Sequence, residues 1–122
     1  MIFTQEELEK KLSYWQKRLR LQDWILEVRI LRAREMAGEY AAQVNWTLSK
    51  KMATIHILDQ VDYPPDCMDS RNMENDLVHE LLHLHFAPIS DHFSEDSPVY
   101  TTFEEQAIES IAYGLVNAER ER

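Results

Sequence analysis

The chain has 122 residues, of which 44% are hydrophobic and 29% are charged, and its formal net charge is −9. That length and composition are typical of one globular domain spanning residues 1–122, and they exclude a disordered chain. The acidic balance argues against nucleic acid as a partner, because phosphate binding needs clustered Lys and Arg.

The first predicted element is an amphipathic helix over residues 5–21. Thr4 and Glu7 have the spacing of a capping box, in which each side chain bonds the backbone N–H of the other residue. Apolar residues then recur at intervals of three and four, which places them on one face of a helix. This expected stripe consists of Leu8, Leu12, Trp15 and Leu19.

Three strands are predicted next, over residues 24–31, 38–48 and 52–58. In the first two stretches, Ile25 aside, apolar and polar residues alternate, as expected for a half-buried strand. The polar turn at residues 49–51 is short, so the second and third strands are expected to form an antiparallel hairpin. Residues 59–69 contain two prolines and several acidic residues, which indicates a loop.

The second predicted helix follows this loop, with Asp69 or Ser70 as its N-cap. Its apolar surface is wide, so this helix is expected to be central and buried. It is predicted to end near residues 87–88, where a proline occurs. Residues 89–100 are polar and are expected to form a loop.

The last predicted helix covers residues 102–118. Thr101 with Glu104, or Thr102 with Glu105, can form its capping box, and the first pair leaves Glu105 free. The expected buried stripe is Phe103, Ala107, Ile108, Ile111, Leu115 and Val116. Together these elements predict an α+β fold: an N-terminal helix, a three-stranded and mainly antiparallel sheet, a central helix and a C-terminal helix.

The sequence His79-Glu80-Leu81-Leu82-His83 lies within the central helix. Residues four apart on a helix share a face, so His79 and His83 can bind one metal ion. Glu80 lies beside them, where it can take a proton from a water molecule without being a ligand. This pattern is typical of a hydrolytic zinc site. The alternative is a buried helix with two hydrogen-bonded histidines and a solvated Glu80.

A catalytic zinc ion usually has three protein ligands. Glu105 is the predicted third ligand, and Glu109, one turn later, is expected to accept the second N–H of a ligand histidine. His92 is an alternative ligand from the predicted loop. His85 follows His83 by two residues, so it points to another side of the helix and is poorly placed.

These residues resemble the gluzincin group of zinc metallopeptidases. The similarity rests on residues 79–83 followed by Glu105 and Glu109, and it extends over residues 24–118. The length and element order are similar to those of minigluzincins and of short phage- and plasmid-associated peptidases. The resemblance implies a minimal zincin-like domain in which the strand at residues 52–58, or its hairpin partner, pairs with an extended substrate. It also implies an oxyanion-stabilising Tyr or His.

Three residues are candidates for that oxyanion donor: His92, Tyr100 and Tyr113. The expected function is zinc-dependent hydrolysis of a peptide or protein substrate, with Glu80 as general base and then general acid. One alternative is an inactive zinc-binding domain that binds a protein partner. Another is a zinc hydrolase that acts on a non-peptide amide. The sequence pattern sets no oligomeric state.

A cytoplasmic location is expected. The N-terminus has no basic region followed by an apolar run, which argues against a signal peptide. No apolar run is long enough to cross a membrane. Cys67 is the one cysteine, so an intrachain disulfide and a cysteine-based zinc cluster are excluded.

Overall fold

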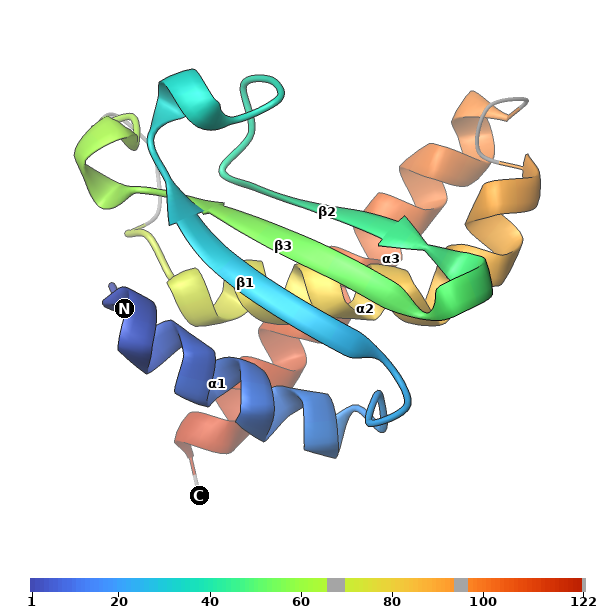
Figure 1. Ribbon diagram of the computed structural model, residues 1–122, viewed down its shortest axis with the longest axis horizontal. Helices are drawn as coiled ribbons and strands as arrows, with labels where there is room; N and C mark the ends of the chain where they lie inside the picture. The colour runs from blue at the N-terminus through green and yellow to red at the C-terminus, as the bar shows by residue number, and fades with distance from the viewer. Residues whose placement is uncertain (66–69, 94–96, 122) are drawn as a thin grey trace.

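The computed structural model describes residues 1–65, 70–93 and 97–121 and has an α+β architecture (Figure 1). A helix is followed by three strands and then by two long helices. The helices are α1 (Gln5–Arg18), α2 (Met73–Phe93) and α3 (Pro98–Arg120), and the strands are β1 (Ile25–Leu31), β2 (Ala42–Thr47) and β3 (Met52–Leu58). None of the helices in the described part of the chain is long and apolar enough to span a membrane.

Helix α1 begins with the predicted capping box between Thr4 and Glu7. It ends at Arg18, three residues earlier than predicted, because Arg20 has a left-handed backbone with a φ of 61°. That conformation interrupts the helical hydrogen bonds and turns the chain toward β1. The apolar stripe of α1 is buried against β1 and α2 through Leu8, Leu12 and Trp15.

The sheet has the strand order β1-β3-β2 and is mixed rather than mainly antiparallel. β2 and β3 form the predicted antiparallel hairpin, whereas β1 pairs with β3 in parallel. The reason lies in residues 32–41, which carry the chain past the end of β3 and place β2 on its far side. β2 starts only at Ala42, four residues after the predicted start, and β1 starts at Ile25. The edge strand next to α2 is therefore β2, and β3 is central.

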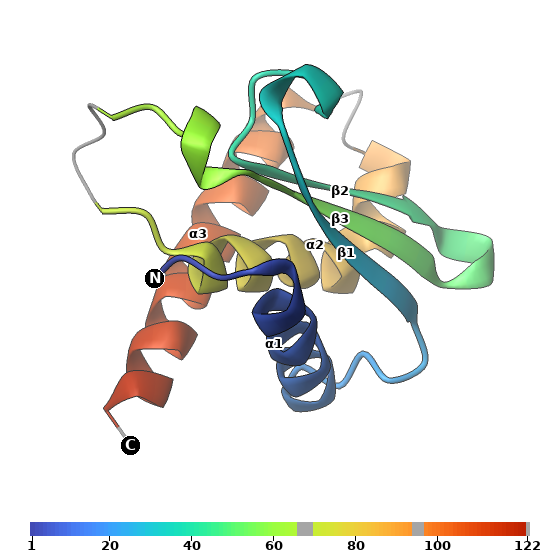
Figure 2. The same cartoon turned by 60° about the vertical axis from the view of Figure 1, so that its left-hand side comes forward.

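Helix α2 contacts β2 and β3 of the sheet and also contacts α1 and α3, whereas α1 packs directly against β1 (Figures 1 and 2). Its N-cap is Asn72, whose side-chain oxygen accepts from the backbone N–H groups of Glu74 and Asn75 at 3.0 and 3.2 Å. The predicted cap Ser70 lies outside the helix, and Asp69 is outside the described residues. Burial on several sides explains the wide apolar surface of α2, which includes Leu77, Val78, Leu81, Leu82 and Leu84.

Helix α2 also continues through Pro88 to Phe93, so the predicted end at residues 87–88 and the predicted loop over residues 89–93 are wrong. A proline inside a helix removes one backbone hydrogen bond. Packing after the proline offsets this loss, because Ser90 is buried and the Trp46 indole N–H donates to Asp91 at 2.9 Å. The last turns of α2 are thereby attached to β2.

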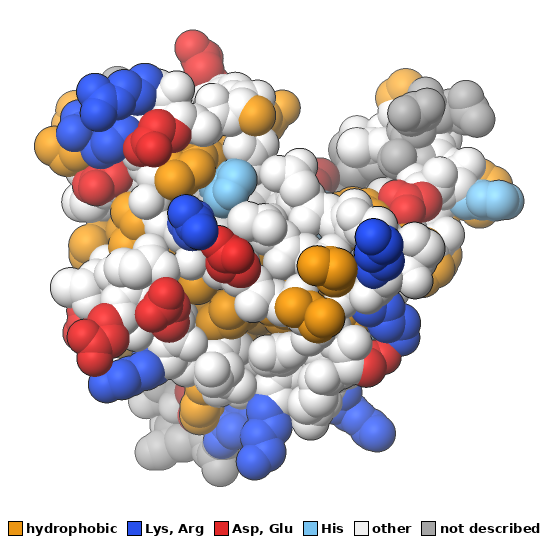
Figure 3. Space-filling view, in the orientation of Figure 1, with side chains coloured by type: hydrophobic (Ala, Val, Ile, Leu, Met, Phe, Trp, Pro, Cys, Tyr) orange, Lys and Arg blue, Asp and Glu red, His pale blue; other side chains and the backbone are white. Residues whose placement is uncertain are grey.

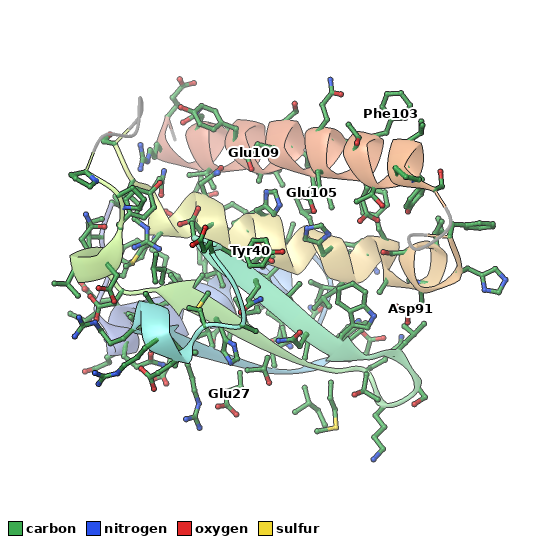
Figure 4. The ribbon with its side chains drawn as sticks, turned by 90° about the horizontal axis from the view of Figure 1, so that it is seen from above. Glu27, Tyr40, Asp91, Phe103, Glu105 and Glu109 are labelled. Carbon is green, nitrogen blue, oxygen red and sulfur yellow. The ribbon has the colours of Figure 1, made fainter. Side chains whose placement is uncertain are left out.

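Helix α3 begins at Pro98, with Ser97 as its N-cap, so neither predicted capping box at Thr101 or Thr102 forms. Its buried face also differs from the prediction. Phe103 is 64% exposed and points away from α2 (Figure 4). Residues 103 and 105 lie about 200° apart around a helix, so turning Glu105 toward α2 turns Phe103 outward. The residues of α3 that are buried are Glu104, Ile108, Ala112 and Val116, whereas Ala107 and Ile111 are exposed.

Candidate metal centre

Helix α2 places His79, Glu80 and His83 on the side that faces α3 and β2. The centroids of the two imidazole rings are 5.1 Å apart, as expected for residues four apart on a helix. The Nε2 atom of His79 lies 4.0 Å from a carboxylate oxygen of Glu80. Glu80 and His83 are buried.

Helix α3 brings Glu105 to both histidines. One carboxylate oxygen lies 3.1 Å from Nε2 of His79, and the other lies 3.0 Å from Nε2 of His83. Figure 4 shows Glu105 and Glu109 on the side of α3 that faces α2. Two imidazole nitrogens and one carboxylate therefore converge from two helices.

The outer nitrogens of the two histidines also contact carboxylates. Nδ1 of His79 donates to Glu109 at 2.6 Å, and Nδ1 of His83 lies 3.4 Å from Glu104. Glu104 is buried and accepts a hydrogen bond of 3.0 Å from the hydroxyl of Tyr100. Each histidine thus has Nδ1 on an outer carboxylate and Nε2 on Glu105, an arrangement that fixes the ring orientation.

The charges in this cluster shift several pKa values. Burial favours a lower pKa for His79, but the Glu105 hydrogen bond and the charges of Glu80, Glu105 and Glu109 outweigh it and raise this pKa to about 9. Hydrogen bonds to His79 and His83 lower the pKa of Glu105. Burial raises the pKa of Glu80 to about 7, against the opposing charges of the two histidines. Glu80 can therefore exchange a proton near neutral pH.

The donor set fits a divalent metal ion. The ligand atoms of His79, Glu80 and His83 lie within 4.8 Å of one another, and so do those of His83, Glu104 and Glu105. Imidazole nitrogen and carboxylate oxygen are ligands that zinc accepts. Both Nε2 atoms face the shared Glu105 carboxylate, so an ion bound there could contact both Nε2 atoms and Glu105 while the Nδ1 atoms keep Glu109 and Glu104 as partners.

A pocket of about 430 Å³ opens onto this cluster. Its walls come from β2, α2 and α3, and from Tyr40, which precedes β2. Figure 3 shows the molecule hollowed between the end that carries residues 32–41 and the end where α2 and α3 meet. The polar and aromatic residues that line the pocket are Tyr40, Gln43, Trp46, His79, Glu80, His83, Ser90, Thr101, Glu104 and Glu105.

The structure separates the other predicted candidates from this pocket. His92 is exposed and packs edge-on against Phe93, with ring centroids 5.3 Å apart. His85 donates to the Leu19 carbonyl at 2.8 Å, at the end of α1. Tyr113 lines another cavity, beside Glu109. Tyr100 contacts Glu104, behind the histidines.

Two residues of this site, Glu104 and Tyr40, were not predicted from the sequence. Glu104 was expected to cap a helix that in fact begins at Pro98. Glu104 lies one turn after Tyr100 and next to Glu105. This spacing indicates a place beside the histidines only when the start of α3 is known. Tyr40 was expected to lie in a strand, although Gly38 two residues earlier indicated a break in that strand.

Comparison with known proteins finds no matching family model, no matching curated protein and no matching solved structure.

Proposed function

We propose that this protein is a zinc-dependent peptidase with a zincin-like site. The observation that supports this most strongly is the convergence of His79, His83 and Glu105 next to Glu80 in an open pocket. The three converging residues would hold the ion. A zinc ion supplies Lewis acidity there, which makes water more acidic and polarises a carbonyl group.

Glu80 is the group that moves the proton. It lies beside the three metal-binding candidates and can take a proton from water as the water oxygen attacks the carbonyl carbon. It then delivers that proton to the leaving amine as the C–N bond breaks. Burial raises the pKa of the Glu80 carboxyl group in the metal-free protein, which makes it a stronger base than an exposed carboxylate.

An extended peptide fits the pocket through β2. Among the described residues this strand pairs with β3 alone, so its other edge carries backbone groups that no strand of the described sheet pairs with. The side chains of Ala42, Val44 and Trp46 line the pocket. A substrate strand that pairs with this edge would pass over Glu80 and Glu105, which supports a peptide or protein substrate.

The test combines Glu80→Gln with chelation. Native mass spectrometry should show one zinc ion on the wild type and on Glu80→Gln, because Glu80 is not expected to be a ligand. Hydrolysis of a peptide library should fall at least about a hundredfold in Glu80→Gln and cease with chelator. Glu6→Gln makes the same chemical change on exposed α1 and should leave hydrolysis unchanged.

Other outcomes favour the alternatives. A wild type that binds zinc but cleaves no peptide would indicate an inactive domain that binds a protein partner. Chelator-sensitive hydrolysis of small amides without cleavage of peptides would indicate a non-peptide hydrolase. Loss of zinc in Glu80→Gln would contradict the assigned role of Glu80.

A further inference from the structure

Residues 32–41 connect β1 to β2 and bring Tyr40 to the pocket of the candidate metal centre. Tyr40 lines that pocket together with His79, Glu80 and Glu105. Figure 4, seen from above, shows Tyr40 in front of α2 and Glu105 between α2 and α3. Its side chain is exposed to solvent, and among the described residues its hydroxyl has no hydrogen-bond partner.

The backbone before Tyr40 is shaped for this ring. Gly38 has a φ of 153°, a conformation that other residues rarely adopt. A Cβ atom at position 38 would lie 2.7 Å from Cε2 of Tyr40. Only glycine therefore allows the ring to pack against the chain in its present position.

The backbone after Tyr40 is held as firmly. The carbonyl oxygen of Ala41 accepts from the backbone N–H of Leu58 at 2.9 Å and from the guanidinium of Arg71 at 3.2 Å. The Arg71 side chain is 2% exposed and pairs with Asp76 of α2 at 3.3 Å. The segment that carries Tyr40 is thus attached both to the sheet and to the start of the helix that holds the histidines.

The N-terminal end of residues 32–41 is attached to Asp62. Asp62 pairs with the Arg32 guanidinium at 2.8 Å and accepts from the backbone N–H of Ala33 at 2.8 Å. The hydrogen bond with Arg32 lowers the pKa of Asp62 to about 2, so this pair is charged at neutral pH. The backbone segment that carries Tyr40 is therefore anchored at both ends, and the Tyr40 hydroxyl is available to bind a ligand.

None of the other four tyrosines can take the same position. Tyr14 is bonded to Glu119, Tyr63 lies under the Arg71 guanidinium, and Tyr100 donates to Glu104. Tyr113 lines the separate cavity beside Glu109. Tyr40 is thus the one tyrosine among the described residues that lines the pocket of the candidate metal centre.

We propose that the Tyr40 hydroxyl donates a hydrogen bond to the carbonyl oxygen of the scissile amide and is the oxyanion-stabilising residue of this site. The inference rests on the proposed peptidase function. When the water oxygen bonds to the carbonyl carbon, the electron pair of the C=O double bond moves to the carbonyl oxygen. Tyr40 stabilises that negative charge and keeps its own proton, and the charge returns when the C–N bond breaks.

The test is Tyr40→Phe, with Tyr113→Phe as the matched control. Loss of one oxyanion donor lowers kcat by about 10²- to 10³-fold, and KM should change little because the donor acts mainly in the transition state. A phosphinic peptide, whose tetrahedral oxygens imitate the oxyanion, should bind Tyr40→Phe at least tenfold more weakly than it binds the wild type. Zinc content and Tm should be unchanged in both variants.

A second variant tests whether the Tyr40 ring must occupy its present position. Gly38→Ala keeps the Tyr40 hydroxyl but forces the ring to move, so it should also lower kcat and weaken phosphinic peptide binding. Equal kcat and equal phosphinic peptide affinity in the wild type and Tyr40→Phe would overturn the proposal while leaving the peptidase function intact. A wild type without peptide hydrolysis would instead refute the proposed function, and unchanged phosphinic peptide affinity in Tyr40→Phe would then still overturn the role of Tyr40.

Discussion

Glu104→Ala removes the buried carboxylate that lies between Tyr100 and His83. In the wild type this carboxylate is 3.4 Å from Nδ1 of His83 and 3.0 Å from the Tyr100 hydroxyl. Without it, the His83 ring loses the group that fixes its orientation and its Nδ1–H loses a partner. We therefore expect zinc to bind more weakly even though Glu104 itself is not the proposed ligand.

The size of this effect follows from burial. Loss of an outer carboxylate partner typically weakens metal binding about 10- to 100-fold, which is about 1.4 to 2.7 kcal/mol. The Glu104 side chain is 6% exposed, so water cannot easily replace it. The Glu109 side chain is 54% exposed, and water can partly replace its bond to His79. We expect a loss near a hundredfold for Glu104→Ala and near tenfold for Glu109→Ala.

Competition with a zinc-binding dye measures both affinities. Glu104→Gln keeps one acceptor oxygen and should recover part of the loss, and Gln106→Ala on the exposed side of α3 is the control. If Glu104→Ala binds zinc as tightly as Gln106→Ala but unfolds at a lower temperature, Glu104 only packs between the helices. That result would refute the assigned contact with His83.

The remaining predictions concern pH and the last turns of α2. The pKa of His79 is raised to about 9, so its protonation stabilises the metal-free protein fully below pH 6.5, and this stabilisation should disappear as pH rises from 6.5 through 9. Urea unfolding in the presence of chelator should show that decrease, and added zinc should oppose it. Pro88→Ala restores a helical N–H at an exposed position and should stabilise the protein by about 1 to 3 kcal/mol, measured as a higher Tm. An unchanged or lower Tm would mean that local packing requires the proline.

The sequence was most informative where local geometry decides the outcome. The spacing of His79 and His83 fixes their relation on any helix, and the four-residue spacing of Glu105 and Glu109 places both on one face of α3. β3 has the predicted bounds because its alternating pattern is flanked by clear turn residues. The structure brings these four side chains together, and their roles at a metal ion stay predictions.

Long-range packing explains what the sequence did not predict. The strand order depends on the path of residues 32–41, and no local pattern encodes which side of β3 receives β2. α2 passes through Pro88 because Trp46, more than forty residues earlier, bonds to Asp91. The buried face of α3 is set by the histidine–glutamate contacts and not by its most apolar residues. Tyr40 gains its position from Arg71, which bonds the neighbouring Ala41, and no local pattern predicts this contact across thirty residues.

The paired contacts of Glu105 bear on whether the protein can fold before it binds the proposed metal ion. Many small metal-binding domains unfold when the ion is removed, because nothing else holds their ligands together. Here one carboxylate contacts both imidazoles, and these contacts raise the pKa values of His79 and His83. The site can therefore be assembled without a metal ion, and a cation that binds there would displace protons from the histidines. Calorimetry should record this as a binding heat that varies with the ionisation enthalpy of the buffer.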